Sequence, residues 1–140
     1  MKLDYNTNDL NSLKISELKR IADYWLRQHL LHKAERNGRN EIYCPIKKKW
    51  FPEDKMHVAH FIDRARMCTR YNLDNCQLIS EQSNLWDAQT PFEGYKSKHH
   101  YDYEILLGEK KVKKLLELSK QICIFARRDY IELIEKYRYV

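Results

Sequence analysis

Glycine and proline are scarce in this sequence, with three residues of each among 140. That scarcity excludes collagen-like chains and disordered chains rich in these residues. Long apolar runs are also missing. No stretch approaches the ~18 consecutive apolar residues of a membrane span, and the first ten residues lack the apolar core of a signal peptide. We therefore expect a folded protein that has no membrane partner and stays in the cytoplasm.

Cysteine is present but sparse. The four cysteines are Cys44, Cys68, Cys76 and Cys123. No two of them form a CxxC pair and no secretory segment is recognisable, so we expect most of them to be buried, reduced thiols and expect no disulfide framework. A zinc site made of Cys44, His57 and His60 with Cys68 or Cys76 stays open as an alternative. Structural zinc is not favoured, because zinc knuckles usually have close ligand pairs on both sides and only the histidines are close here.

Basic residues exceed acidic ones. The chain has 26 Lys and Arg against 20 Asp and Glu, a formal net charge of +6. Polyanions, and nucleic acid first among them, are the natural partners of such a chain, although a basic balance alone often reports only solubility. With 43% apolar and 33% charged residues, the composition is typical of a folded protein. The length suits one domain over residues 1–140.

Apolar periodicity predicts a mainly helical α+β fold. One amphipathic helix is expected at about 16–34, and a second helical region at about 109–138, divided into two helices by a break near 120–129. Between them, prolines, aromatic residues and β-branched residues favour short strands, one near 56–62 and one at CQLIS, residues 76–80. A further helix is expected to begin between Ser80 and Ser83 and to stop before Pro91.

The middle of the chain contains the side chains that phosphodiester hydrolysis requires. His60 ends the first predicted strand, where a neutral imidazole can accept a proton from water. Asn75 stands at the entry to the second strand and is expected to bond across the loop, and Asn84 lies in the first turns of the following helix. Either asparagine alone would be an ordinary turn or cap residue. The histidines expected to be ordinary surface or core residues are His29, His32, His99 and His100.

Three arginines lie between His60 and the second strand. Arg64, Arg66 and Arg70 have guanidinium groups that can bind phosphate through two parallel hydrogen bonds. Loop arginines are usually just solvated. Their position beside a candidate phosphate site favours a role in DNA binding.

The segment AHFIDRARMCTRYNLDNCQLISEQSNLWDAQ, residues 59–89, resembles the HNH nucleases, and within them more closely the phage lambda NinG or Rap recombination endonucleases. The histidine, the arginine-rich loop, the asparagine and the helix-borne asparagine follow in the same order and at similar spacing. A weaker similarity extends to about residues 20–137. The resemblance implies a ββα-metal module of two short antiparallel strands and a helix at about 42–90, flanked by additional helices.

The resemblance also assigns roles to these residues. His60 would be the general base, Asn75 would orient the loop, and Asn84 would bind a divalent cation, Mg²⁺ or Mn²⁺. Related sites often have an aspartate directly before the histidine as a metal ligand, whereas this chain has Ala59. Asp87, one helical turn after Asn84, and His57, close to His60 in sequence, are equal candidates for the missing ligand.

The family carries two CxxC pairs around its module, and this chain retains one of the four cysteines. Cys44 occupies one of these positions, and the others hold Lys47, Ser80 and Ser83. No four-cysteine zinc site can therefore form, and the module is expected to hold together by packing alone. The aromatic residues expected to replace the metal are Trp50, Phe51, Phe61 and Trp86.

Three functions follow as hypotheses. The first is a metal-dependent endonuclease which, by resemblance, acts on branched or recombination-intermediate DNA in a phage or prophage setting, with a homodimer left open. The second is a DNA-binding accessory protein that kept the fold and lost cleavage, suggested by Ala59 and the missing cysteines. The third is a structural zinc protein that uses Cys44, His57 and His60.

Overall fold

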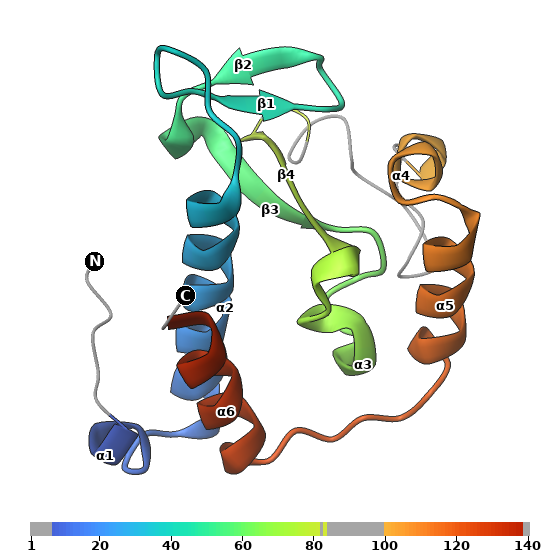
Figure 1. The fold of residues 1–140 in the computed structure, drawn as a ribbon. Coiled ribbons are helices and arrows are strands. Elements are labelled where there is room, and N and C mark those ends of the chain that lie inside the picture. Colours follow the sequence, from blue (N-terminus) through green and yellow to red (C-terminus); the bar gives the residue numbers. More distant parts are fainter. Residues whose placement is uncertain (1–6, 82, 84–99, 139–140) are drawn as a thin grey trace. The chain divides into compact units, whose positions relative to one another are not determined.

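The computed structural model describes residues 7–81, 83 and 100–138 (Figure 1). The fold is α+β and mostly helical, as the sequence predicted. The chain divides into two compact units, one drawn from Met1–Lys33 and Ile124–Val140 and the other from Ala34–Cys123. We call them unit 1 and unit 2 and describe each by itself. The expectation of a single domain stays a prediction.

The regular elements that the structure describes in unit 1 are helices. Its helices are α1 (Thr7–Leu10), α2 (Ile15–Lys33) and α6 (Arg127–Arg138). The predicted helix at 16–34 is confirmed by α2. Helices α2 and α6 lie side by side (Figure 1), so each covers the apolar face of the other. The residues that α2 buries are Leu18, Ile21, Ala22, Leu26 and Leu31, and those that α6 buries are Tyr130, Ile134 and Tyr137.

Unit 2 contains two antiparallel sheets of two strands each among its described residues. The strands are β1 (Ile42–Cys44) paired with β2 (Lys49–Phe51), and β3 (Met56–His60) paired with β4 (Cys76–Ser80). A short 3₁₀ helix, η1 (Glu53–Lys55), joins the two sheets. The two strands predicted near 56–62 and 76–80 are confirmed. The first ends at His60, and Phe61 and Ile62 continue into the core beyond it.

The long connection between β3 and β4 is more structured than the polar loop that the sequence predicted. It contains a four-residue helix, α3 (Met67–Arg70), and a 3₁₀ helix, η2 (Leu73–Asn75). Helix α3 packs against helix α5 (Glu109–Ser119) of the same unit. We call the connection from Phe61 to Asn75 the β3–β4 loop.

The remaining helices lie in the second half of the chain. Helix α4 (His100–Leu107) leads into α5 through Gly108, whose φ of +85° is a left-handed conformation that favours glycine. The predicted break near 120–129 is confirmed, because α5 ends at Ser119 and α6 begins at Arg127. Most of the helix predicted between Ser80 and Pro91 lies outside the described residues, so the ββα module itself stays a prediction. Within the described residues, no helix is long and apolar enough to cross a membrane.

The aromatic residues expected to replace a metal behave differently from one another. Phe61 is 1% exposed and belongs to the core, whereas Trp50 is 42% exposed. The expectation was therefore wrong for Trp50, which lies on the short outer strand β2 and contacts the ring of Tyr43 on β1. Phe51 is half-buried, and Trp86 lies outside the described residues.

Candidate active site

His60 is the last residue of β3 and lies opposite Cys76 of β4. Its Nε2 atom is 2.9 Å from the main-chain oxygen of Arg70 in the β3–β4 loop. A carbonyl oxygen can only accept a hydrogen bond, so Nε2 must carry the proton. In a neutral ring the basic lone pair then belongs to Nδ1. The hydrogen bond therefore selects the tautomer as well as the orientation of the imidazole.

Asn75 ties the two ends of the β3–β4 loop together. It is 0% exposed, and its Oδ1 accepts a hydrogen bond from the main-chain N–H of Ile62 at 2.7 Å. Its Nδ2 donates to the carbonyls of Ile62 at 3.1 Å and Thr69 at 3.0 Å. The bonding across the loop that the sequence predicted is present. The part of Asn75 in catalysis stays a prediction.

Asn72 performs the ordinary turn function that could have belonged to Asn75. Its Oδ1 accepts from the main-chain N–H of Asp74 at 2.9 Å and so caps η2. The two asparagines are three residues apart and differ completely in burial, since Asn72 is half-buried at the surface and Asn75 is enclosed. Because both residues are asparagines, the residue type alone does not indicate which of them is buried.

The three loop arginines occupy two kinds of position. Arg64 and Arg66 are exposed and have access to a polyanion. Arg70 is only 6% exposed, and its Nη1 donates to the carbonyl of Arg64 at 3.0 Å. Direct phosphate binding by all three arginines stays a prediction, and the burial of Arg70 counts against it for that residue.

The predicted metal ligands are less well supported. Asn84 and Asp87 lie outside the described residues. His57 is in β3, three positions before His60, and side chains at odd spacing in a strand point to opposite faces. This placement counts against His57 as a ligand at a site shared with His60. Among the residues that the structure describes, no group of three or more His, Cys, Asp or Glu side chains could hold a metal ion.

Cys44 lies at the centre of a buried polar cluster. Its Sγ accepts hydrogen bonds from the main-chain N–H groups of Lys47 at 3.4 Å and Ser80 at 3.3 Å, and it lies 3.9 Å from Oγ of Ser83. Burial raises the pKa of this thiol, but the hydrogen bonds to the sulfur outweigh that effect and bring the pKa below its ordinary value. The hydroxyl of Ser80 also donates to that of Ser83 at 3.0 Å.

By the resemblance, these four residues stand at the positions of the family's cysteines, and in the structure hydrogen bonds connect them. The expectation that packing alone holds the module was therefore wrong. A hydrogen-bonded cluster of Cys44, Ser80 and Ser83, with the main chain of Lys47, joins the β1–β2 sheet to β4.

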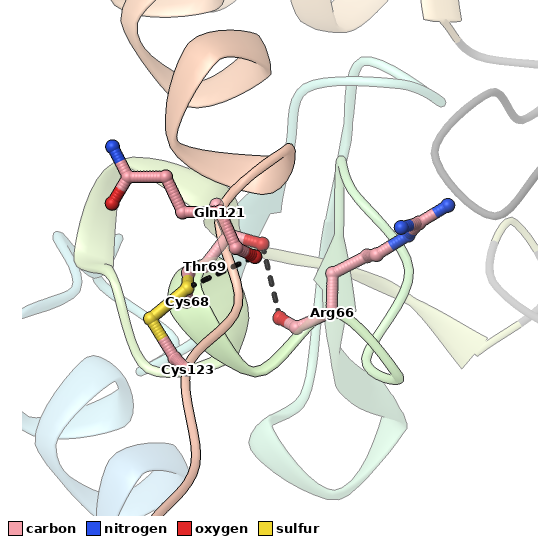
Figure 2. The surroundings of a disulfide bond; sticks show 5 residues. All are labelled: Arg66, Cys68, Thr69, Gln121 and Cys123. Carbon is pink, nitrogen blue, oxygen red and sulfur yellow. Dashed lines mark hydrogen bonds between the residues drawn. A yellow bond between two sulfur atoms is a disulfide. The ribbon is translucent and has the colours of Figure 1, made fainter.

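A disulfide joins Cys68 in α3 to Cys123, four residues after α5 ends (Figure 2). Their Cα atoms are 5.2 Å apart although 55 residues separate them in sequence. The expectation of reduced thiols was therefore wrong for this pair, and it is confirmed for the buried, free Cys44 and Cys76. The packing of α3 on α5 creates the proximity, and no local spacing signals it. The mixed zinc site with Cys68 is also excluded in this oxidised state.

Beside the disulfide, Thr69 Oγ1 donates to the carbonyl of Arg66 at 3.1 Å, and the side chain of Arg66 points away from the sulfur atoms (Figure 2). The disulfide therefore fixes one side of α3 and leaves Arg66 directed outward. Residues 68, 69 and 70 are held by three different partners: Cys68 by Cys123, the carbonyl of Thr69 by Asn75, and the guanidinium of Arg70 by the carbonyl of Arg64.

Comparison of the chain with models of protein families, with curated proteins and with solved structures found no match. The resemblance to HNH nucleases therefore rests on the residues of the sequence alone.

Proposed function

We propose that this chain is a metal-dependent DNA endonuclease of the HNH type in which His60 is the general base. The single observation that carries the proposal is the 2.9 Å hydrogen bond from His60 Nε2 to the carbonyl of Arg70, which assigns the basic lone pair to Nδ1. Holding a histidine in one tautomer is of little use to a surface residue. It is what a base needs if it is to accept a proton from one direction.

The chain's own residues account for the proton transfer. His60 Nδ1 takes a proton from water, the oxygen of that water forms a bond to phosphorus, and the bond from phosphorus to the leaving oxygen breaks. Asn75 keeps the loop, and with it the acceptor of Nε2, in place. A bound Mg²⁺ or Mn²⁺ would stabilise charge on the phosphoryl and leaving oxygens. Asn84 and Asp87 are the residues proposed to hold it.

DNA is the proposed substrate because the chain has a net charge of +6 and has exposed arginines a few residues after His60. Arg64 and Arg66 are the phosphate contacts that we favour. Branched or recombination-intermediate DNA, a phage or prophage origin, action in the bacterial cytoplasm and a homodimer are proposed from the resemblance alone. The disulfide is unusual for a reducing compartment, so the cytoplasmic location stays a prediction.

A DNA-binding protein without nuclease activity is the second candidate. The observation that favours it is Ala59, which is 4% exposed and places a methyl group where related sites often have a metal-binding carboxylate. If no other carboxylate replaces it, the cation would be lost and the arginine loop would remain. The two candidates share a fold and differ in metal dependence.

The test is an incubation of the purified chain with duplex, single-stranded and four-way-junction DNA at several pH values. We expect cleavage in Mg²⁺ or Mn²⁺ and none in the presence of a chelator. Intact DNA under all conditions, together with measurable DNA binding, would favour the accessory protein. Elemental analysis gives a separate control, because one tightly held zinc ion per chain would support the structural zinc protein instead.

A further inference from the structure

Arg70 occupies the point where the β3–β4 loop meets His60. Its carbonyl accepts two hydrogen bonds, from His60 Nε2 at 2.9 Å and from Cys76 Sγ at 3.4 Å. Its Nη1 donates to the carbonyl of Arg64 at 3.0 Å. The main chain of this residue therefore faces the candidate base, while its side chain turns back across the loop.

The surroundings of Arg70 differ from those of a phosphate-binding arginine. The residue is 6% exposed, and its guanidinium carbon lies 5.6 Å from the ring centre of Tyr71, which is itself 5% exposed. Arg64 and Arg66 belong to the same loop and are exposed. A guanidinium that binds a DNA phosphate needs access to the polyanion, which these two arginines have and Arg70 largely lacks.

We propose that Arg70 is a positioning residue for His60 and does not bind DNA phosphate. Its guanidinium spans the turn from residue 64 to residue 70 and so fixes the carbonyl that selects the Nε2–H tautomer of His60. The kinetic consequence rests on the proposed nuclease function. The structural consequence, which is the tautomer of His60, does not.

Local chemistry explains why an arginine is suited to this place. A planar guanidinium keeps its donors in a fixed fork and can bond to a carbonyl while its face lies on an aromatic ring. Asn75 holds the carbonyl of Thr69, and the disulfide holds Cys68, so Arg70 has to fix only the final peptide group of α3. Loss of the guanidinium frees that peptide group to rotate.

Two substitutions separate positioning from phosphate binding. Arg70→Met keeps the bulk of the side chain and removes both charge and donor, whereas Arg70→Gln removes the charge and keeps an amide donor. Arg64→Met is the matched control, because it makes the same chemical change at an exposed position and leaves the carbonyl of residue 64 in place. Circular dichroism and thermal unfolding would establish that each full-length variant is folded.

The first readout is the tautomer of neutral His60, from the ¹⁵N chemical shifts of its ring. We expect the Nε2–H form in the wild type and in Arg64→Met, a mixture of tautomers in Arg70→Met, and recovery of the Nε2–H form in Arg70→Gln. A pure Nε2–H form in Arg70→Met would overturn the proposal. This readout does not require cleavage, so it tests Arg70 even if the nuclease function proves wrong.

The second readout is cleavage and binding of a short DNA duplex. We expect Arg70→Met to lower kcat roughly tenfold to a hundredfold with Kd within about twofold of the wild type. Arg70→Gln should recover part of kcat. Arg64→Met should weaken binding and reduce the slope of log Kd against log salt by about one. If both Arg70 variants weaken binding and lower that slope as Arg64→Met does, Arg70 binds phosphate and the proposal fails.

Discussion

The helix pair α2–α6 of unit 1 and the β3–β4 loop of unit 2 are stabilised in different ways. In unit 1, helices α2 and α6 bury apolar side chains against each other, and removing a fully buried side chain such as Ile134 would cost ~2 to 5 kcal/mol. In unit 2, the β3–β4 loop is held by buried polar groups, with Thr69 at 0%, Arg70 at 6% and Asn75 at 0% exposure, and by a disulfide. The first region depends on packing and the second on directional bonds.

This difference indicates where function is expected. An apolar interface tolerates exchange of one apolar side chain for another of similar volume, so it constrains individual residues weakly. A buried hydrogen bond needs a specific donor, acceptor and direction, and an unsatisfied one is costly. A chain that fixes a surface loop in this way gains a defined orientation for His60, which packing of apolar residues would not provide.

The largest effect on stability should come from the disulfide. Because 55 residues separate Cys68 from Cys123, the loss of the link should lower the free energy of unfolding by about 4 kcal/mol through the entropy of the unfolded chain. Urea unfolding of the Cys68→Ser, Cys123→Ser double variant checks this, and hydrogen exchange should increase in α3 and not in α2. If the wild type has the same free energy of unfolding with and without dithiothreitol, the disulfide does not stabilise the chain and the prediction is wrong.

A somewhat smaller effect is expected at Asn75. Asn75→Ala should lower the free energy of unfolding by about 3 kcal/mol, because it leaves the N–H and carbonyl of Ile62 and the carbonyl of Thr69 without their buried partner. Asn72→Ala is the matched control and should cost about 1 kcal/mol or less, since Asn72 provides one half-buried cap. Chemical denaturation of both variants measures the contrast, and equal losses would remove the special role of Asn75.

The smallest effect concerns unit 1 and pH. Burial, and then the charges of Lys33, Lys136 and His32, lower the pKa of His29 below its ordinary value. The folded chain therefore binds a proton at His29 less readily than the unfolded chain does. The stability associated with His29 is fully present above the ordinary histidine pKa of ~6.5 and is lost as the pH falls from there towards the lower folded-state pKa.

His29→Gln should therefore make the free energy of unfolding less dependent on pH in that range. Urea unfolding of the wild type and the variant between pH 5 and pH 8 compares the two directly. A difference between the two proteins that does not change with pH would show that His29 acts only through packing.

The regular elements of both units could be predicted from the sequence because each shows a residue pattern that recurs or is bounded by turn residues. The apolar residues of α2 recur over five turns, and the strands β3 and β4 are bounded by turn residues. The same holds for the break between α5 and α6. In these segments many residues give the same signal, so no single residue decides the outcome.

The details of the β3–β4 loop depend on single residues and on distant ones. Helix α3 has four residues, too few for periodicity, and it exists where α5 covers it. The pairing of Cys68 with Cys123 follows from that contact, and the burial of Arg70 depends on the folded loop around it. His60 and Asn75 could be predicted because their residue types and order are informative, whereas the acceptor of the His60 hydrogen bond is a main-chain carbonyl that every sequence contains.

The most direct test of the account is the cleavage rate of His60→Ala in Mg²⁺ or Mn²⁺. Because a positioned base contributes ~10²-fold to 10⁴-fold, we expect at least a ~100-fold loss of kcat, with folding and DNA affinity close to those of the wild type. His32→Ala, which changes an exposed histidine of α2, should cut as the wild type does. Cleavage by His60→Ala at a rate near that of the wild type would contradict the assignment of His60 as the base.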